Sequence, residues 1–323
     1  MYRTSYLAFT FAAATMLFPG CKSNNRPLVG SPLSSKVSSS APATAEQVAK
    51  EMRGNVDCPA KVSGERLPNE PVDDVVGVRP GMALDEAANV ILCDDPHLVV
   101  KENSSRGYDM NTYGQHIRQG FDAKFAEARI VKTSAQIMQD MQDDAMRRGG
   151  NAYVAPLQPG QMRYYVSSMG MPGQERVLSV AREEYFAAGK LPTVDSVKQA
   201  LVAKYGEPTQ ANGSGAVSYL WWEHEPSGSK IAAGSSLSGA CRINASPDSG
   251  TSLSTQCGPV VGALIQSSND NLGLARSLAV TAQNGSWGYS VLKSTEEGLR
   301  KNDEMRRARE LSDASRQAAK PKI

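Results

Sequence analysis

The sequence predicts an α+β protein in which short helices pack on small antiparallel sheets. Apolar residues recur at helical spacing after Pro80 and again after Pro192, and each stretch ends near a further proline. Short runs of alternating apolar and polar residues lie between and beyond these stretches and predict strands. The spacing from Pro80 to Pro96 equals the spacing from Pro192 to Pro208, which suggests two similar units.

The first α+β unit is expected over residues 46–158. It includes a short strand at residues 75–78 and a helix that begins near Leu84 and stops before Pro96. Residues 134–147 place apolar side chains at helical spacing before two glycines, which predicts a second helix.

The second α+β unit is expected over residues 159–292. Residues 194–205 predict a helix, because Gly206 and Pro208 directly after it are typical of a helix end. Strands are expected at residues 162–169, 176–186, 217–222, 260–265 and 278–281.

Residues 293–323 predict a polar C-terminal helix or tail. Ser294 and Glu297 have the spacing of a capping box, which places the helix start at Ser294. Few apolar residues follow, so a solvated helix is expected, with a partner-binding helix as the alternative.

The N-terminus predicts export and lipidation. Residues 1–20 combine Arg3, an apolar run and Gly20, which is typical of a lipoprotein signal peptide when Cys21 follows. The Cys21 thiol is the expected lipid acceptor, with palmitate among the acyl groups. The alternative is an ordinary cleaved signal that leaves a cysteine near the cut.

The segment after the signal predicts a tether and a location. Residues 21–45 are rich in Ser, Pro, Asn and Ala, so we expect a disordered tether. Lys22 follows the cysteine, whereas lipoproteins retained in the inner membrane usually have Asp there. This resemblance implies the periplasmic face of the bacterial outer membrane.

Four further cysteines fit an oxidising compartment. Cys58, Cys93, Cys241 and Cys257 allow three pairings, and sequence alone does not choose among them. Their spacing suggests one disulfide bond in each half, Cys58 with Cys93 and Cys241 with Cys257. A metal site is the alternative, although no Cys-x-x-Cys occurs and the three histidines are scattered.

The remaining composition and motifs point away from several functions. The formal charge of +2 gives no electrostatic reason to expect nucleic-acid binding. No Gly-x-Ser-x-Gly, His-Glu-x-x-His or P-loop motif occurs. His224 lies between Glu223 and Glu225, but alternation along a strand would separate it from both carboxylates. We therefore expect no enzyme activity, no cofactor and no metal.

Two adjacent tryptophans suggest a binding surface. Trp221 and Trp222 lie in a predicted strand, so one should face the core and the other should face solvent. An exposed tryptophan is typical of a protein-binding surface.

The segments Val78–Met82 and Tyr205–Pro208, together with the strand that ends at Trp221 and Trp222, resemble BamE-like (SmpA/OmlA) outer-membrane lipoprotein domains. The resemblance covers under a third of the chain. It implies helices packed on a small antiparallel sheet and a lipidated cysteine, here Cys21. It also implies binding of proteins or envelope components without catalysis. The fold resembles that of tandem-repeat secreted inhibitors, which bind enzymes across a sheet.

These observations predict a non-enzymatic bacterial envelope lipoprotein. Its periplasmic domains would bind an envelope protein or a cell-wall component such as peptidoglycan. An envelope hydrolase or a secreted-type enzyme inhibitor is the alternative.

Overall fold

The structure is a computed structural model that describes residues 41–63, 70–103, 108–149, 157–245 and 252–317. The predicted signal peptide, Cys21 and most of the predicted tether lie outside these residues. The described residues form one antiparallel sheet, with the strand order β1-β2-β3-β4-β8-β7-β6-β5. The strands are β1 (Leu98–Glu102), β2 (Gly120–Phe125), β3 (Met162–Met169), β4 (Arg176–Tyr185), β5 (Gln210–Ser214), β6 (Val217–Glu223), β7 (Pro259–Ser267) and β8 (Ala275–Asn284).

The sheet consists of two four-stranded meanders. Strands β1 to β4 follow one another across the first meander, and β5 to β8 follow one another across the second. The last strands of the two meanders, β4 and β8, pair with each other and join the halves into one sheet. The predicted α+β class is therefore confirmed, with one continuous sheet in place of separate small ones.

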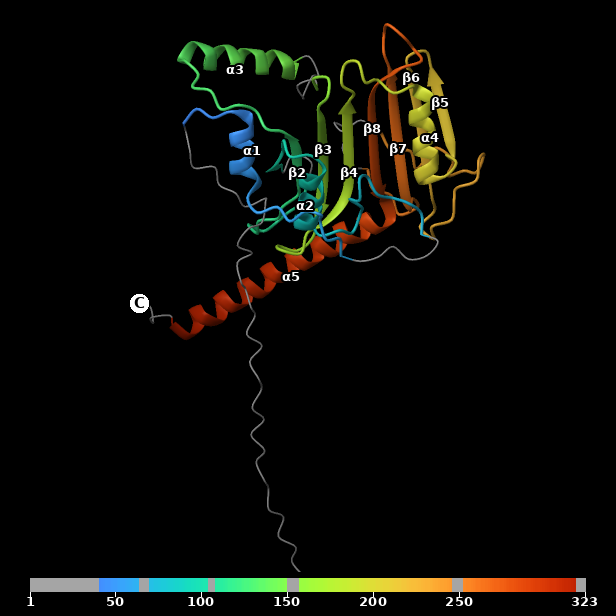
Figure 1. Cartoon of the computed structure of the whole chain (residues 1–323). Coiled ribbons are helices and arrows are strands. Elements are labelled where there is room, and N and C mark those ends of the chain that lie inside the picture. The colour runs from blue at the N-terminus through green and yellow to red at the C-terminus, as the bar shows by residue number, and fades with distance from the viewer. Residues whose placement is uncertain (1–40, 64–69, 104–107, 150–156, 246–251, 318–323) are drawn as a thin grey trace, which may run out of the picture.

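Each meander is preceded by a helix. Helix α2 (Leu84–Asp94) precedes β1, and α4 (Val194–Tyr205) precedes β5. Figure 1 shows both helices on the same face of the sheet. Their apolar sides and that face form one buried core, which extends across both meanders. The predicted pair of similar units is thus present as two repeats of one helix and four strands.

The hairpins of the two repeats match in detail. Ala83, directly before α2, forms a bridge with Arg176, and Thr193, directly before α4, forms a bridge with Leu274. Both the β3–β4 hairpin and the β7–β8 hairpin also have an irregularity in register near the turn. Because two independent features coincide, the repeats share local geometry as well as strand order.

The prolines that suggested the duplication are not equivalent. Pro80 lies three residues before Ala83, whereas Pro192 lies directly before Thr193. The equal proline spacing is therefore out of register with the structural repeat by two residues.

The boundary between the repeats also differs from the expected domain boundary. β3 pairs with β2, so residues 162–185 belong to the first meander. The expected boundary between residues 158 and 159 falls inside that meander. Alternation identifies a strand but does not determine its neighbour, which is why the sequence grouped β3 and β4 with the second unit.

The predicted strand at residues 75–78 is a tight turn. Val75 and Val78 form an isolated bridge, and the residues between them have positive φ, 50° at Val76 and 81° at Gly77. This is the conformation of a two-residue hairpin turn. The prediction of a strand was wrong because a run of β-branched residues does not reveal a reversal of the chain.

The C-terminal helix begins earlier than predicted. Helix α5 (Gly285–Gln317) follows β8 directly, and Oδ1 of Asn284 accepts a hydrogen bond from the backbone N–H of Trp287. Ser294 lies inside the helix, where its hydroxyl donates to the Val291 carbonyl. The predicted capping box at Ser294 was therefore wrong.

Two further helices flank the first repeat. Helix α1 (Ala45–Arg53), which the sequence did not predict, begins with a capping box formed by Thr44 and Gln47. Helix α3 (Ser134–Gly149) confirms the predicted helix at residues 134–147. None of the described helices has the length and apolar character needed to cross a bilayer.

Both expected disulfide bonds are present. Cys58 is joined to Cys93, which links the segment before α2 to the last turn of that helix. Cys241 is joined to Cys257 within the insert between β6 and β7. The arrangement of one bond in each half is confirmed.

Candidate functional site

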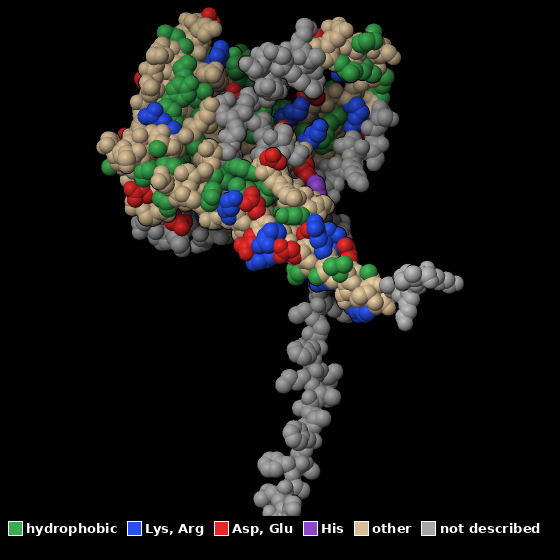
Figure 2. All heavy atoms as spheres, turned by 180° about the vertical axis from the view of Figure 1, so that it is seen from behind, with side chains coloured by type: hydrophobic (Ala, Val, Ile, Leu, Met, Phe, Trp, Pro, Cys, Tyr) green, Lys and Arg blue, Asp and Glu red, His purple; other side chains and the backbone are tan. Residues whose placement is uncertain are grey.

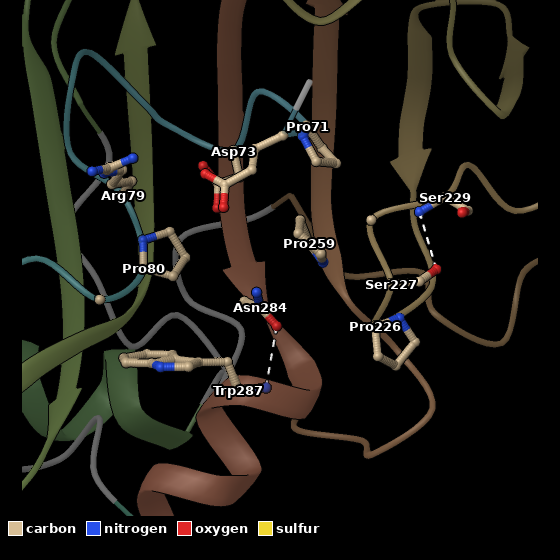
Figure 3. A pocket seen from close by; sticks show the side chains of 13 residues that line it. Pro71, Asp73, Arg79, Pro80, Pro226, Ser227, Ser229, Pro259, Asn284 and Trp287 are labelled. Carbon is tan, nitrogen blue, oxygen red and sulfur yellow. Dashed lines mark hydrogen bonds between the residues drawn. The ribbon is translucent and has the colours of Figure 1, made fainter. Parts of the chain in front are cut away.

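A pocket of about 580 Å³ lies at the end of the sheet where β7 begins and β8 ends. We call it the end pocket. Four separate segments and the first turn of α5 contribute to it, so the pocket joins the segment before α2 to the second repeat and the C-terminal helix (Figure 3). Its lining residues are Glu70, Pro71, Asp73, Arg79, Pro80, Gly81, Pro226, Ser227, Gly228, Ser229, Pro259, Asn284 and Trp287.

One wall is the turn before α2. The Gly81 N–H donates to the Val177 carbonyl at 2.8 Å, which fixes the turn to the start of β4. Gly81 has φ +90°, and a Cβ atom there would lie 3.8 Å from Cζ2 of Trp287. Glycine is favoured because other residues are strained at this φ. The segment Val78–Met82, which resembles the BamE-like domains, thus places Arg79 and Pro80 in the pocket wall.

The floor includes an aromatic ring from α5. Trp287 lies in the first turn of that helix, where its N–H donates to Oδ1 of Asn284 at 3.2 Å. Its side chain is half-buried, and Figure 3 shows the ring beneath Pro80. Because the cap fixes the start of α5 at the end of β8, the ring position is set by the backbone.

The opposite wall is the tight turn after β6. The Gly228 N–H donates to the Glu225 carbonyl, and the Ser229 N–H donates to Oγ of Ser227. A Cβ atom at Gly228, which has φ +85°, would lie 3.4 Å from Cδ of Pro71. The segment that contains Pro71 and Asp73 therefore lies against this turn and bridges the two walls.

The pocket combines rigid apolar surfaces with charged groups of both signs. Pro71, Pro80, Pro226 and Pro259 have restricted backbones, so binding there needs little ordering of the walls. The carboxylates of Glu70 and Asp73 and the guanidinium of Arg79 supply acceptors and donors for polar groups. This chemistry suits a compact polar ligand that also has apolar surface.

The Glu-His-Glu segment does not converge on one point. Glu223 is fully buried and accepts hydrogen bonds from Thr209 and from the Gly239 N–H, whereas Glu225 is exposed. His224 Nδ1 lies 3.1 Å from the Pro259 carbonyl. Burial lowers the pKa of His224, the Pro259 carbonyl opposes that shift, and Lys230 adds to it. This geometry fits a strand end that enters a turn.

Both tryptophans of β6 are buried, so the expectation of one exposed ring was wrong. Trp222 faces the helix layer and donates to the Gly206 carbonyl. Trp221 faces the other side, where it stacks on Tyr219 and donates to the Ile243 carbonyl. The insert between β6 and β7 covers Trp221, so neither ring presents a binding surface.

The sheet face opposite the helices has a charged area in the first meander. Register places Lys101 opposite Asp122, Lys124 opposite Arg163, and Arg163 opposite Glu183. We call these five residues the charged sheet face. Figure 2 shows a hollow on this side of the molecule, with Lys and Arg side chains in it. Arg163 forms an ion pair with Glu183, whereas Lys101 and Lys124 are exposed.

The described residues contain no cluster of three or more His, Cys, Asp or Glu side chains that could hold a metal ion. The chain was also compared with known proteins, and no protein-family model, curated protein or solved structure matches it.

The sequence did not predict the end pocket. The segment that contains Arg79 and Pro80 was noted only for its family resemblance, and Trp287 and the acidic segment around Asp73 were not singled out. An asparagine three residues before Trp287 was the available signal, because Asn is a preferred N-cap. No local signal links Asp73 to the turn after β6.

Proposed function

We propose that this chain is a non-enzymatic lipoprotein of the bacterial outer membrane that binds a cell-wall component in the end pocket. The observation that carries the proposal is the pocket itself, in which rigid proline walls, the Trp287 ring and charges of both signs meet. Anchoring through Cys21 and the periplasmic location rest on the signal sequence.

Peptidoglycan fragments have the chemistry that this pocket would recognise. Their stem peptides carry carboxylates and ammonium groups, which could pair with Arg79 and with the acids Glu70 and Asp73. Their sugar rings have apolar faces that can stack on the Trp287 ring. A rigid pocket with a few placed polar groups is typical of small-ligand sites.

Calorimetric titration of the full chain with soluble disaccharide-peptide fragments of peptidoglycan tests this proposal. Trp287→Ala should weaken binding at least tenfold, because it removes the aromatic floor. Ser229→Tyr should also weaken binding, because Ser229 is exposed and a larger side chain there would fill the pocket. Tyr289→Ala is the control, since Tyr289 is an exposed aromatic residue on the next part of α5.

Two outcomes would overturn the proposal. One is unchanged affinity in Ser229→Tyr with a normal thermal unfolding curve. The other is no binding by the unaltered chain at millimolar fragment concentration.

Anchoring has its own test. The unaltered chain should incorporate labelled palmitate and partition into membranes, whereas Cys21→Ser should do neither. Equal solubility of the two forms, with no label in either, would contradict lipidation.

A second candidate function is protein binding across the sheet, as in secreted enzyme inhibitors. The charged sheet face supports it, because Lys101 and Lys124 are exposed on the sheet face opposite α2 and α4. Charged rims steer protein association and set its salt dependence. Replacing both lysines with glutamate should abolish capture of a protein partner by crosslinking in intact envelopes, while fragment binding in the end pocket stays unchanged.

A further inference from the structure

Exposed apolar side chains concentrate in one short part of the chain. Of the eleven large hydrophobic residues that are exposed in the described part of the chain, five lie within residues 130–141. We call them the Ile–Met face. They are Ile130 (61% exposed), Val131 (72%), Ile137 (49%), Met138 (60%) and Met141 (68%). A clustered apolar patch marks an interaction surface more often than scattered apolar residues do.

Helix α3 places the apolar residues on one side. At 100° per residue, Ile137, Met138 and Met141 fall within an arc of about 100°. Gln136 and Asp140 project from the other side of the helix, and the helix start is capped by hydrogen bonds between Thr133 and Gln136. The helix is therefore amphipathic and has a defined apolar side.

No other described helix or strand packs on this apolar side. Figure 1 shows α3 apart from the sheet and from the other helices, and Figure 2 shows hydrophobic side chains on its outer surface. Methionine is unbranched and adapts to irregular apolar surroundings, so such a face suits a deformable partner.

The Ile–Met face begins next to the point where the chain runs back toward Cys21. Ala43 pairs with Arg129 in a two-residue bridge, and the Arg129 side chain donates to the Ala41 carbonyl and to Glu51. Ile130 is the next residue. The N-terminal end of the folded body and the Ile–Met face therefore lie on the same part of the molecule.

The distance from this point to the lipid anchor is limited by chain length. Twenty residues separate Cys21 from Ala41, which reach about 70 Å when fully extended. A flexible chain of that length has an end-to-end distance of about 25 Å. A bilayer that holds Cys21 is thus within reach of the Ile–Met face, and the tether makes contact between them an intramolecular event.

We infer that the Ile–Met face rests on the phospholipid surface that holds the lipid anchor. This inference rests on the proposed lipidation of Cys21. The apolar side chains enter the boundary between headgroups and acyl chains, as in other interfacial helices. The polar side of α3 carries Asp140 and Asp143, and Lys132 pairs with Asp140. Among the described side chains of residues 130–143 no cationic cluster favours anionic lipid, so we take the lipid to be zwitterionic, such as phosphatidylethanolamine.

The consequence is an orientation of the whole body. Contact at residues 130–141 holds the β1 side of the sheet toward the membrane. The tether then limits how far the body can reach, and the helix contact limits how it can turn.

The native methionines allow a direct test. The acylated full chain is bound to vesicles of phosphatidylethanolamine and phosphatidylcholine and treated with chloramine-T, which oxidises exposed methionine to the sulfoxide. Mass spectrometry follows each site. The rates at Met138 and Met141 should fall at least fivefold on vesicle binding. Met305, which is 51% exposed on α5, is the internal control and should not change.

A variant and a second tether separate this inference from lipidation. Ile137→Asp changes an exposed residue, so the fold should persist while protection of Met138 and Met141 is lost. A Cys21→Ser chain with an N-terminal histidine tag, held on nickel-chelating lipid, should show the same protection as the acylated chain. Protection in this form without acylation of the natural chain would support contact between the Ile–Met face and phospholipid and would refute lipidation of Cys21.

Three results would overturn the inference. The first is vesicle-bound protein in which Met138 and Met141 are oxidised as fast as Met305. The second is protection that appears in solution at high protein concentration, which would assign the face to a second copy. The third is protection that appears only when envelope proteins are added, which would assign it to a protein partner.

Discussion

The two repeats carry inserts at the same place, between their second and third strands, and the inserts behave in opposite ways. In the first repeat, residues 126–161 include α3, which lies apart from the sheet (Figure 1). In the second, residues 224–245 and 252–258 fold back over the sheet. There the Ile243 carbonyl accepts from Trp221, and the Ala245 carbonyl accepts from Thr281.

The composition of the inserts explains the difference. The second insert has a small core of its own, in which Ile231, Ile243 and the disulfide-bonded Cys241 and Cys257 pack with Val260. The first insert leaves Ile130, Val131, Ile137, Met138 and Met141 exposed. Two repeats with one topology thus acquire different surfaces, because the insert decides which part of the shared sheet face is covered.

The largest expected effect concerns β2 and β6, the second strands of the two repeats, on the side that faces the helices. Trp222→Ala should destabilise the fold by about 3–5 kcal/mol, since it removes a fully buried ring and leaves a cavity. Phe125 lies near the end of the corresponding strand and is half-buried, so Phe125→Ala should cost less. Urea unfolding of both variants measures the difference. Equal losses would show that the two helix layers are equally well packed.

The next effect concerns the disulfide bonds. Replacing Cys241 and Cys257 with serine should cost about 3 kcal/mol in the chain-entropy model, and the Cys58–Cys93 pair should cost about 4, because its loop is longer. Only loss of the Cys241–Cys257 bond should release the insert between β6 and β7 and expose Trp221. A red shift of tryptophan emission in the native state reports that exposure. The same shift in the Cys58 and Cys93 variant would contradict the separate roles of the two bonds.

A smaller effect concerns pH and the second insert. Burial lowers the pKa of His224 in the folded state, so below the ordinary histidine pKa of about 6.5 the unfolded chain binds a proton that the folded chain resists. Stability should therefore fall as the pH drops from about 6.5. Urea unfolding between pH 5 and 8 measures the slope. His224→Asn should flatten it, and an unchanged slope would assign the pH dependence to other groups.

The smallest expected effect comes from removing α3, the helix of the first insert, and it tests the comparison of the two inserts directly. Replacing residues 133–149 with a short Gly-Ser linker should change stability by less than about 0.5 kcal/mol, because α3 stands apart from the core. An equal replacement of residues 234–250 should destabilise the fold strongly, since it removes the cover of Trp221. Thermal unfolding of both variants provides the measurement. A large loss in the first variant would show that α3 packs on the body.

Local patterns predicted α2, α3, α4 and the strands β3, β4, β6, β7 and β8, but not α1, β1, β2 or β5. β3 and α4 have the predicted bounds, because alternation and the Gly-Pro stop are properties of the segment itself. The capping box at Ser294 failed because the same pattern also occurs inside a helix. The prediction of a strand at residues 75–78 failed because valine rarely adopts positive φ. No sequence rule therefore predicts a turn at Val76.

The candidate site was not predictable as a site, although Arg79 and Pro80 lie in the segment that resembles a known family. Trp287 reaches the end pocket because α5 starts directly after β8. Asp73 reaches it because the hydroxyl of Tyr205 donates to the Asp74 carbonyl and Pro71 lies against the turn at Gly228.

By itself, the sequence indicated most of the helices and five of the eight strands, suggested two similar units, and suggested one cysteine pair in each half. These features depend on residue periodicity and spacing. Only the tertiary structure decided that the two meanders join through β4 and β8, that the second insert buries Trp221, and that the end pocket forms between the segment before α2, the second repeat and α5. Each of these depends on contacts between residues far apart in the chain. Such contacts are selected by the packing of whole surfaces, which no short pattern encodes.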